Sequence, residues 1–463
     1  MIYKVIYFSF LVNIIFCQEY PQDFIEYHLK KLRFDIGENW KNNSTLDPIP
    51  VFDDDYAKSN DTIRIKFNYG LVTKYSDSDG FGNSINFYAK TFINENLYMY
   101  MYPRIVTNAN LFERYSGIPR PRKRLGFNSG ETDLAGVVFN GNNFQAQISR
   151  GRQIWGAGNN IHILLGEKSA PYDYFMLKFF FRNAQFKTFN GFLERKDGYN
   201  RYISARAIEW SNKKSVLISL SEVIVYSGIN RPMDFSYLNP ISSHLEVELN
   251  DRQNQLGTSS GNAMWQLSTD ILTRSNIRFS GNFIIDELAI DKIERDDGKA
   301  HGLGWSFGLN WNMFKKDNYF LIFQSKWYRM GTHVSKHAVG YNNFVHRSLP
   351  IGWEIGNDGE QLSIGLILFR PKNLILDVNF NIKSLGQNSI SINPYNPNED
   401  YKKTSFPSGL VKETVFFSTK FSYKINNYLR CNLNTEYLLK PDNNFNFNFN
   451  FNYFFSQNFN IIN

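Results

Sequence analysis

The sequence is poor in cysteine and histidine and has no long hydrophobic run after its first residues. It holds 2 cysteines and 7 histidines among 463 residues. Beyond the N-terminal segment, no stretch approaches the ~18 consecutive apolar residues of a membrane-spanning helix, which excludes a helical membrane protein. The pattern His-Glu-x-x-His is missing, and the match Gly257-Thr-Ser-Ser-Gly261 stands in a long polar connection without the strand-turn-helix context of a nucleophile elbow. The sequence therefore lacks the signals of two large classes of hydrolase.

The first residues are typical of an export signal. Lys4 precedes the apolar run Val5–Phe16, which is too short to span a bilayer. We expect residues 1–17 to be a signal peptide that is cleaved near Cys17–Gln18. Lipidation of Cys17 is the alternative, although the bulky Phe16 stands where lipidation signals have a small residue. Loss of Cys17 leaves Cys431 as a lone cysteine and excludes an intrachain disulfide.

Aromatic residues are abundant in a chain that is polar on average. They make up 17% of the residues, with 42 Phe and 27 Tyr, yet the mean hydropathy is −0.39. A membrane β-barrel reconciles these values, because only every second residue of its strands meets lipid. Residues Phe445–Tyr453 alternate Phe or Tyr with Asn, which gives a strand one aromatic face and one carboxamide face. Such a strand suits a wall between lipid and water; a strand in the core of a soluble sandwich is the alternative.

Strand-like runs recur along the rest of the chain. We expect an all-β fold, a transmembrane antiparallel β-barrel of about 18 strands (16–18) over residues 61–463, because single-chain outer-membrane barrels have even strand numbers. The runs are residues 63–72, 84–93, 97–104, 133–139, 144–150, 174–181, 185–193, 199–210, 215–225, 263–274, 276–285, 303–311, 318–328, 361–369, 374–384, 414–424, 428–439 and 445–455.

The connections between these runs alternate between mostly tight and mostly long. The long ones are residues 105–132, 151–173, 226–262, 286–302, 329–360 and 385–413. Outer-membrane barrels have short periplasmic turns and long outer loops, so this phasing places residues 18–60 in the periplasm. The spacing of Phe24, His28 and Leu32 predicts a short amphipathic helix in that segment. A solvated linker is the alternative.

Several motifs in the middle of the chain carry special residues. They are Gly151–Arg152 followed by Trp155-Gly-Ala-Gly158, the tract Ala170–Tyr174, Arg201–Arg206, Tyr237–Pro240, Asp286–Glu287, and Gly352–Gly356 with Asp358. In this order they resemble the capsule-assembly Wzi family of Gram-negative outer membranes, over about half of the chain (134–366). Gln153 and Ala157 depart from the family pattern. The expected fold is unaffected by these departures, but the identity of the bound glycan does not transfer to this chain.

The resemblance implies an eighteen-stranded barrel with a helical periplasmic element that acts as a lectin and holds capsular polysaccharide on the cell. The expected partners are this polysaccharide, anionic forms included, and outer-membrane lipid. We expect a monomer without cofactor or metal in the outer membrane of a Gram-negative bacterium, and no nucleic-acid partner for an exported chain. A porin or a sugar-selective channel with the same fold is the alternative function.

The motifs supply candidate polysaccharide-binding or lumenal residues. These are Arg150, Arg152, Trp155, Arg231, Asp286, Glu287, Arg347 and Trp353. Arg pairs bidentately with carboxylates and phosphates, and Trp stacks on rings. Arg150 and Arg152 stand at alternating positions and are expected to share a lumenal face if their strand continues. The structural alternative, which we favour for each single residue, makes Trp155 a plug or girdle aromatic and pairs lumenal Arg with Glu222, Asp286 or Glu287.

Other polar clusters carry weaker signals. The basic run of Arg120, Arg122, Lys123 and Arg124 falls in a predicted outer loop, where it suits an acidic polysaccharide or simply a solvated face. His333 and His337 have i, i+4 spacing with His346 nearby, but they fall in a loop rather than on a helix. Asp77–Gly80 begins like a calcium loop without its later ligands, so we expect a turn. We therefore expect no enzyme, with a membrane-embedded hydrolase as a remote alternative.

Overall fold

The computed structural model describes residues 32, 40, 43–46, 62–112, 115–119, 121–123, 125–244, 247, 261–316, 318–426, 428–441 and 444–462. The expected signal peptide and the expected periplasmic helix, apart from Leu32, lie outside these residues.

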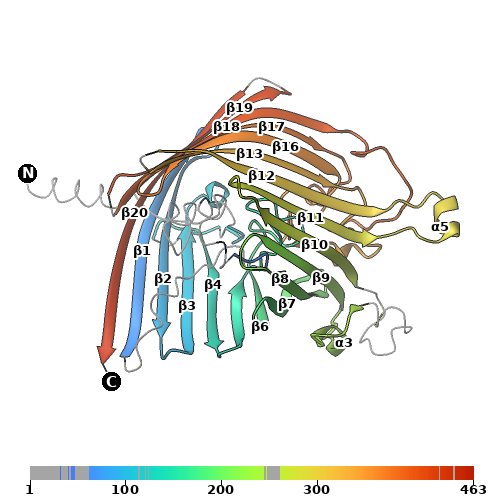
Figure 1. The fold of residues 1–463 in the computed structure, drawn as a ribbon, viewed down its shortest axis with the longest axis horizontal. Coiled ribbons are helices and arrows are strands. Elements are labelled where there is room, and N and C mark those ends of the chain that lie inside the picture. The colour runs from blue at the N-terminus through green and yellow to red at the C-terminus, as the bar shows by residue number, and fades with distance from the viewer. Residues whose placement is uncertain are drawn as a thin grey trace, which may run out of the picture.

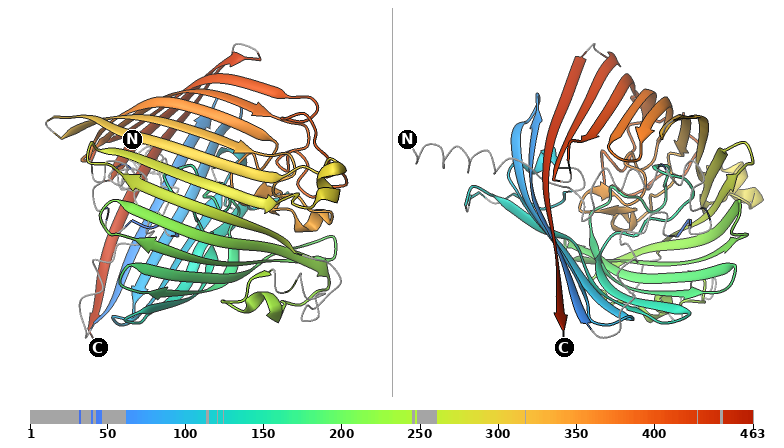
Figure 2. Two further views of the ribbon diagram at one scale, coloured as in Figure 1. Left: turned by 45° about the vertical axis from the view of Figure 1, so that its right-hand side comes forward. Right: turned by 60° about the vertical axis from the view of Figure 1, so that its left-hand side comes forward.

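Within the described residues, eighteen antiparallel strands form one sheet that closes where β20 pairs with β1 (Figures 1 and 2). The closed barrel confirms the predicted fold and strand number. Its strands are β1 (Thr62–Ser76), β2 (Gly80–Phe92), β3 (Leu97–Val106), β4 (Ser129–Asn140), β5 (Phe144–Gly151), β6 (Tyr172–Phe180), β7 (Ala184–Lys196), β8 (Tyr199–Ser211), β9 (Val216–Ile229), β10 (Asn262–Leu272), β11 (Ile277–Glu287), β12 (Gly302–Lys316), β13 (Tyr319–Met330), β16 (Gly359–Arg370), β17 (Leu374–Leu385), β18 (Lys412–Lys424), β19 (Leu429–Lys440) and β20 (Asn444–Ile462).

Short elements lie in the connections. They are the hairpin of β14 (Val345–His346) and β15 (Leu349–Pro350), the helices α3 (Phe235–Leu238) and α5 (Lys292–Asp296), and the 3₁₀ turns η3 (Ala109–Leu111) and η4 (Gly340–Asn342). None of the described helices is long and apolar enough to cross a membrane.

The two ends of the barrel differ, as the alternation of connections predicts. At one end, the short-turn rim, every connection has four residues or fewer. The other end, the long-loop rim, carries the connections 107–128, 152–171, 230–261, 288–301, 331–358 and 386–411, together with the short 77–79, 197–198 and 441–443. β1 and β2 run further than predicted, because their hairpin continues in register up to Ser76 and Gly80.

The two faces of the wall differ as well. On β11, Phe279 and Phe283 are exposed on the outside, whereas Arg278 and Asn282 are buried on the lumenal side. At the closing strand, Phe447 lies 5.7 Å from Tyr75 of β1, between ring centres, on the outer face. Asn448 lies opposite Ser76 of β1, which is buried. An apolar outside and a polar inside are the pattern of a barrel that stands in lipid.

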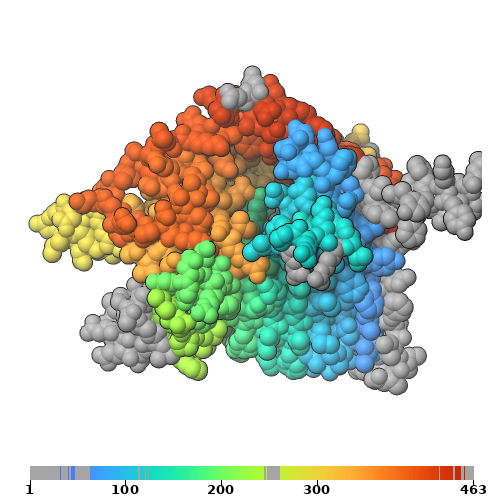
Figure 3. Space-filling view, turned by 180° about the vertical axis from the view of Figure 1, so that it is seen from behind, coloured from blue at the N-terminus to red at the C-terminus, as the bar shows by residue number. Residues whose placement is uncertain are grey.

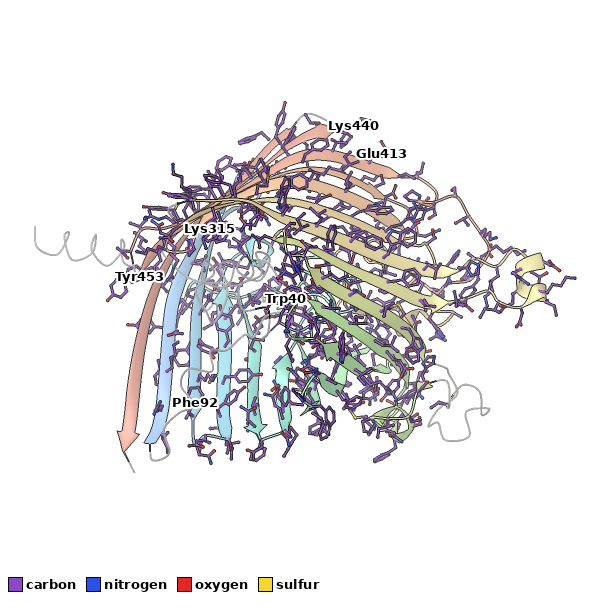
Figure 4. The ribbon with its side chains drawn as sticks, in the orientation of Figure 1. Trp40, Phe92, Lys315, Glu413, Lys440 and Tyr453 are labelled. Carbon is purple, nitrogen blue, oxygen red and sulfur yellow. The ribbon has the colours of Figure 1, made fainter. Side chains whose placement is uncertain are left out.

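Of the described residues that precede β1, Trp40 lies inside the barrel (Figure 4). The Trp40 ring centre lies 5.4 Å from the guanidinium of Arg278. The Thr45 hydroxyl donates to Glu209 of β8 at 2.6 Å, and Lys187 of β7 donates to the carbonyl of Leu46 at 3.0 Å. This part of the 18–60 segment therefore packs into the lumen.

Candidate functional site at the long-loop rim

Two long connections fold into the lumen, and together they are called the plug, residues 152–171 and 331–358. The amide of Gly166 donates to the carbonyl of Ile351 at 2.9 Å, and that of Trp353 donates to Ile163 at 3.3 Å. A Cβ on Gly352 would collide with the carbonyl of Ile163, so this close approach of two backbones requires glycine. The plug is thus a folded unit rather than two separate loops.

Polar lumenal side chains bind the backbone of the plug. Asn282 of β11 accepts from the amide of Ala157 at 2.7 Å and donates to the carbonyl of Ile161 at 3.2 Å. Ser306 of β12 donates to the same carbonyl at 2.6 Å. Backbone groups taken from water need such partners, so the polar inner wall serves the plug as well as a watery lumen.

The two candidate tryptophans belong to this plug. Trp155 has no exposed surface, and its ring meets Phe189 of β7 edge-on with 5.3 Å between centres. Trp353 is 6% exposed and lies parallel to the ring of Tyr328 of β13 at 5.2 Å. Both rings are buried in the plug, so neither presents an exposed face to a sugar, and their positions agree with the structural alternative.

Arg150 and Arg152 do not share a face. β5 ends at Gly151, where the chain turns inward. Arg150 therefore lies on the outer face and pairs with Asp173 of β6 at 2.8 Å. Arg152 enters the lumen, where it donates to Asp133 at 2.8 Å and to the carbonyl of Ser169 at 2.6 Å.

The carboxylates expected to pair with these arginines have other partners. Glu222 lies on the outer face of β9 and binds Arg206 at 2.9 Å and His244 at 2.5 Å. Asp286 accepts from the amide of Ser335 at 2.6 Å, and Glu287 binds Lys299 at 2.5 Å. The predicted pairing of these carboxylates with the lumenal arginines was wrong. Glu222 faces the outer side of the wall, and Asp286 and Glu287 contact residues of neighbouring loops instead.

The remaining candidates are scattered. Arg231 is buried against Asp234 at 2.8 Å. Arg122 and Lys123 are exposed, whereas Arg120 and Arg124 lie outside the described residues. The described residues contain no group of three or more side chains arranged to hold a metal ion.

Three tyrosines that the motifs did not single out meet at the long-loop rim, and they are called the tyrosine cluster. Tyr199 begins β8, Tyr341 lies in η4, and Tyr395 lies in the connection 386–411. The rings of Tyr199 and Tyr341 stack at 4.1 Å with 18° between their planes, and Tyr395 lies 6.0 Å from Tyr341. All three rings are partly exposed.

Charged groups surround the tyrosine cluster. Glu194 of β7 accepts from the Tyr395 hydroxyl at 2.7 Å and from Arg201 at 2.5 Å. Burial and the Glu194 carboxylate raise the pKa of Tyr395, which keeps its hydroxyl a donor. The amino group of Lys196 lies 5.6 Å from the same ring.

Arg347 joins this network from the plug. Its amide donates to Glu194 at 3.2 Å and its guanidinium donates to Ser116 at 3.0 Å. Among the predicted candidates that the structure describes, Arg347 lies beside the tyrosine cluster. Stacked, partly exposed rings next to cations and a carboxylate can bind sugar rings by their faces and their hydroxyls by hydrogen bonds. The signal in the sequence was faint: each tyrosine follows or lies near a turn, and their loops are far apart along the chain.

No protein-family model matches the sequence, and no curated protein matches it. Among solved structures, the chain is similar to Wzi of Escherichia coli, an outer-membrane protein involved in group 1 capsule assembly and a carbohydrate-binding β-barrel. The identity is 11%, the match covers 85% of this chain and 84% of that one, and the TM-score is 0.57. The chain is also similar to OprD of Pseudomonas aeruginosa, with 6% identity, 88% and 98% coverage and a TM-score of 0.48. The likeness to Wzi is one of fold, that of an outer-membrane β-barrel.

Proposed function

We propose that this protein stands in the outer membrane of a Gram-negative bacterium and binds a surface or capsular polysaccharide at its long-loop rim without chemically changing it. The observation that carries the proposal is the tyrosine cluster, which is partly exposed at the end of the barrel that holds the long loops. A polymer repeats its sugar units, so weak stacking at one rim is reinforced when many barrels hold one chain.

The filled lumen favours this function over that of a porin. The plug packs against the wall from β6 to β13, with Trp155 fully buried inside it. Thr45 and Leu46, which precede β1, contact the lumenal wall near the other rim. A wide diffusion pathway needs an open lumen, whereas a binding rim gains rigidity from a filled one.

The experiment is to delete the gene in the bacterium that carries it and to measure cell-attached and shed polysaccharide. We expect attached polysaccharide to fall and shed polysaccharide to rise, and complementation with the wild-type gene to restore both. Complementation with the double variant Tyr199→Ala, Tyr341→Ala should restore less than a tenth of the attachment, roughly the effect of losing two ring contacts of ~1 kcal/mol or more.

The matched control is Tyr437→Ala, because Tyr437 is exposed on the outer wall in β19, which does not pair with the strands β7 and β8 beside the cluster. This variant should complement fully. Unchanged attachment in the deletion strain would refute polysaccharide binding, and large steady single-channel currents from the purified protein would favour the porin.

A further inference from the structure

An open groove of about 770 Å³ lies on the outer wall, where neither the plug nor the tyrosine cluster takes part. Its floor contains Ala135 and Val137 of β4, and its sides contain Met99 of β3, Ile148 of β5 and Phe175 of β6. Met99, Val137, Ile148 and Phe175 are successive cross-strand partners, so they form one row of apolar side chains on the outer face.

The next row toward the long-loop rim is different. Ala135, Arg150, Asp173 and Phe192 are successive partners there. Arg150 binds both oxygens of Asp173 through one terminal nitrogen, at 3.0 and 2.8 Å. The groove therefore has an apolar lower part and an ion pair at its upper part.

A strap of chain, residues 230–244, overhangs the groove. It packs on the outer face of β8 and β9, where Tyr237 is buried and stacks on Tyr226 at 4.5 Å. Ser204 of β8 donates to the carbonyl of Tyr237 at 2.7 Å. Met233 and Leu238 of the strap line the groove, and Figure 3 shows the yellow-green residues of this part of the chain next to blue-green residues of earlier strands. The groove is thus walled by firmly held residues.

The ion pair lies near the long-loop end of its strands, and the ends of the strands are where a membrane barrel meets lipid headgroups. Arg150 is the residue before the last of β5. Arg329, the residue before the last of β13, forms a second outward ion pair with Glu360 at 3.2 Å. Charged side chains among acyl chains are costly, whereas at the headgroup level they are tolerated. The apolar row below then faces acyl chains.

We propose that this groove binds a sugar-headed lipid of the outer leaflet, with an acyl chain on the apolar row and a sugar at Arg150 and Asp173. A sugar hydroxyl both donates and accepts, so it matches a neighbouring guanidinium and carboxylate. A bare phosphate headgroup is repelled by the Asp173 carboxylate. This inference goes beyond the binding of polysaccharide and needs only that the barrel stands in an outer membrane.

The test uses the full-length protein in nanodiscs that contain phosphatidylethanolamine and a diacylated glucosamine lipid at equal amounts. Native mass spectrometry counts the lipids that each barrel retains. We expect one glucosamine lipid on the wild type, at least tenfold less on Ala135→Phe, which fills the floor, and at least threefold less on Arg150→Gln. Binding of phosphatidylethanolamine should stay low throughout.

The control is Thr269→Phe, in a second outer groove of about 320 Å³ that is lined by residues of β10–β13 without a charged side chain. It should retain the lipid as the wild type does. If Ala135→Phe does not fold, Val137→Trp replaces it. Equal retention by wild type and groove variant, or equal retention of the two lipids, would overturn the proposal, and neither result affects the polysaccharide-attachment assay.

Discussion

Asp133 is the carboxylate at which the wall and the plug meet. It is fully buried on β4, and its Oδ1 accepts from Arg104 of β3 at 3.2 Å and from Arg152 of the plug at 2.8 Å. Glu131 also pairs with Arg104. Removing one member of a buried ion network takes a counter-charge from the others where water cannot replace it, which makes such a residue sensitive to substitution.

We expect Asp133→Asn to lower the free energy of unfolding by about 3–5 kcal/mol, because two buried guanidinium groups lose a carboxylate that they share. The measurement is urea unfolding in short-chain lipid vesicles. Asp173→Asn serves as the comparison, since its pair with Arg150 is largely exposed, and should cost less than about 1 kcal/mol. Equal costs for the two variants would mean that the buried network does not stabilise the plug.

His346 gives the plug a dependence on pH. Its Nε2 donates to the carbonyl of Pro171 at 3.0 Å, and its Nδ1 is buried with no hydrogen-bond partner among the described residues. Burial lowers the pKa of His346 to about 4. A proton on Nδ1 would therefore be placed where nothing accepts it.

From this we predict a loss of stability as the pH falls from about 6.5 to about 4, because the unfolded chain takes up a proton that the folded chain refuses. The loss levels off below pH 4 and amounts to about 3 kcal/mol. His346→Gln keeps a donor for Pro171 and cannot titrate, so its unfolding curves should lose this pH-dependent part. An identical pH dependence in wild type and variant would contradict the assignment.

Arg150 illustrates what sequence reasoning misses at this scale. Alternation correctly relates side chains within a strand, but β5 ends one residue after Arg150 and the relation stops there. The end of the strand depends on Gly151, on the inward turn and on contacts that the plug makes far along the chain. Residues such as Tyr341 and Tyr395 likewise come together only through tertiary folding.

At the scale of elements, the strands were predictable and the plug was not. Period-two alternation and turn residues are local signals, and they located all eighteen strands of the described barrel. The inward fold of residues 152–171 and 331–358 rests on pairs such as Gly166 with Ile351, which lie far apart in the sequence. No local pattern distinguishes such a loop from one that extends into solvent.

Asp358 holds the plug to the connection 386–411. Its carboxylate accepts from the Thr332 hydroxyl at 2.8 Å, from the Asn388 amide at 3.0 Å and from the amide and hydroxyl of Ser408 at 2.9 and 2.5 Å. Asp358 is fully buried. If its carboxylate were removed, water could not take its place as the acceptor for these donors.

We expect Asp358→Ala to loosen the plug and to raise the frequency of open-channel events in planar bilayers by at least tenfold. Asp377→Ala is the matched control, because Asp377 accepts from Gln324 and Asn379 on the lumenal wall without touching the plug. It should leave the current traces unchanged. Traces of Asp358→Ala that match the wild type would show that other contacts suffice to hold the plug.

The whole molecule is a barrel whose wall separates an apolar outer face from a polar lumen, and chain segments enter the lumen at both ends. The plug enters from the long-loop rim, and the described residues before β1 lie near the short-turn rim. The aromatic and carboxamide alternation at the end of the chain belongs to β20, which pairs with β1 and β19 and so removes the free edges of the sheet. Closure gives every wall strand a hydrogen-bonded neighbour on each side, as a bilayer requires.

Neighbouring residues in the middle of β18 test which solvent wets each face. Phe417 is exposed on the outer face and lies 5.1 Å from the ring of Phe380 of β17. Ser418 points into the barrel, where it accepts a hydrogen bond from Asn381 at 3.1 Å. A charged group on a lipid-facing strand costs ~2–4 kcal/mol near the bilayer midplane, whereas a lumenal charge stays in contact with water and polar groups.

Phe417→Lys should therefore slow assembly into vesicles and lower the free energy of unfolding by about 2–4 kcal/mol. Ser418→Lys should change the free energy of unfolding by less than about 1 kcal/mol. Similar losses in both variants would mean that both faces of β18 meet the same solvent, which a barrel wall in a membrane does not permit.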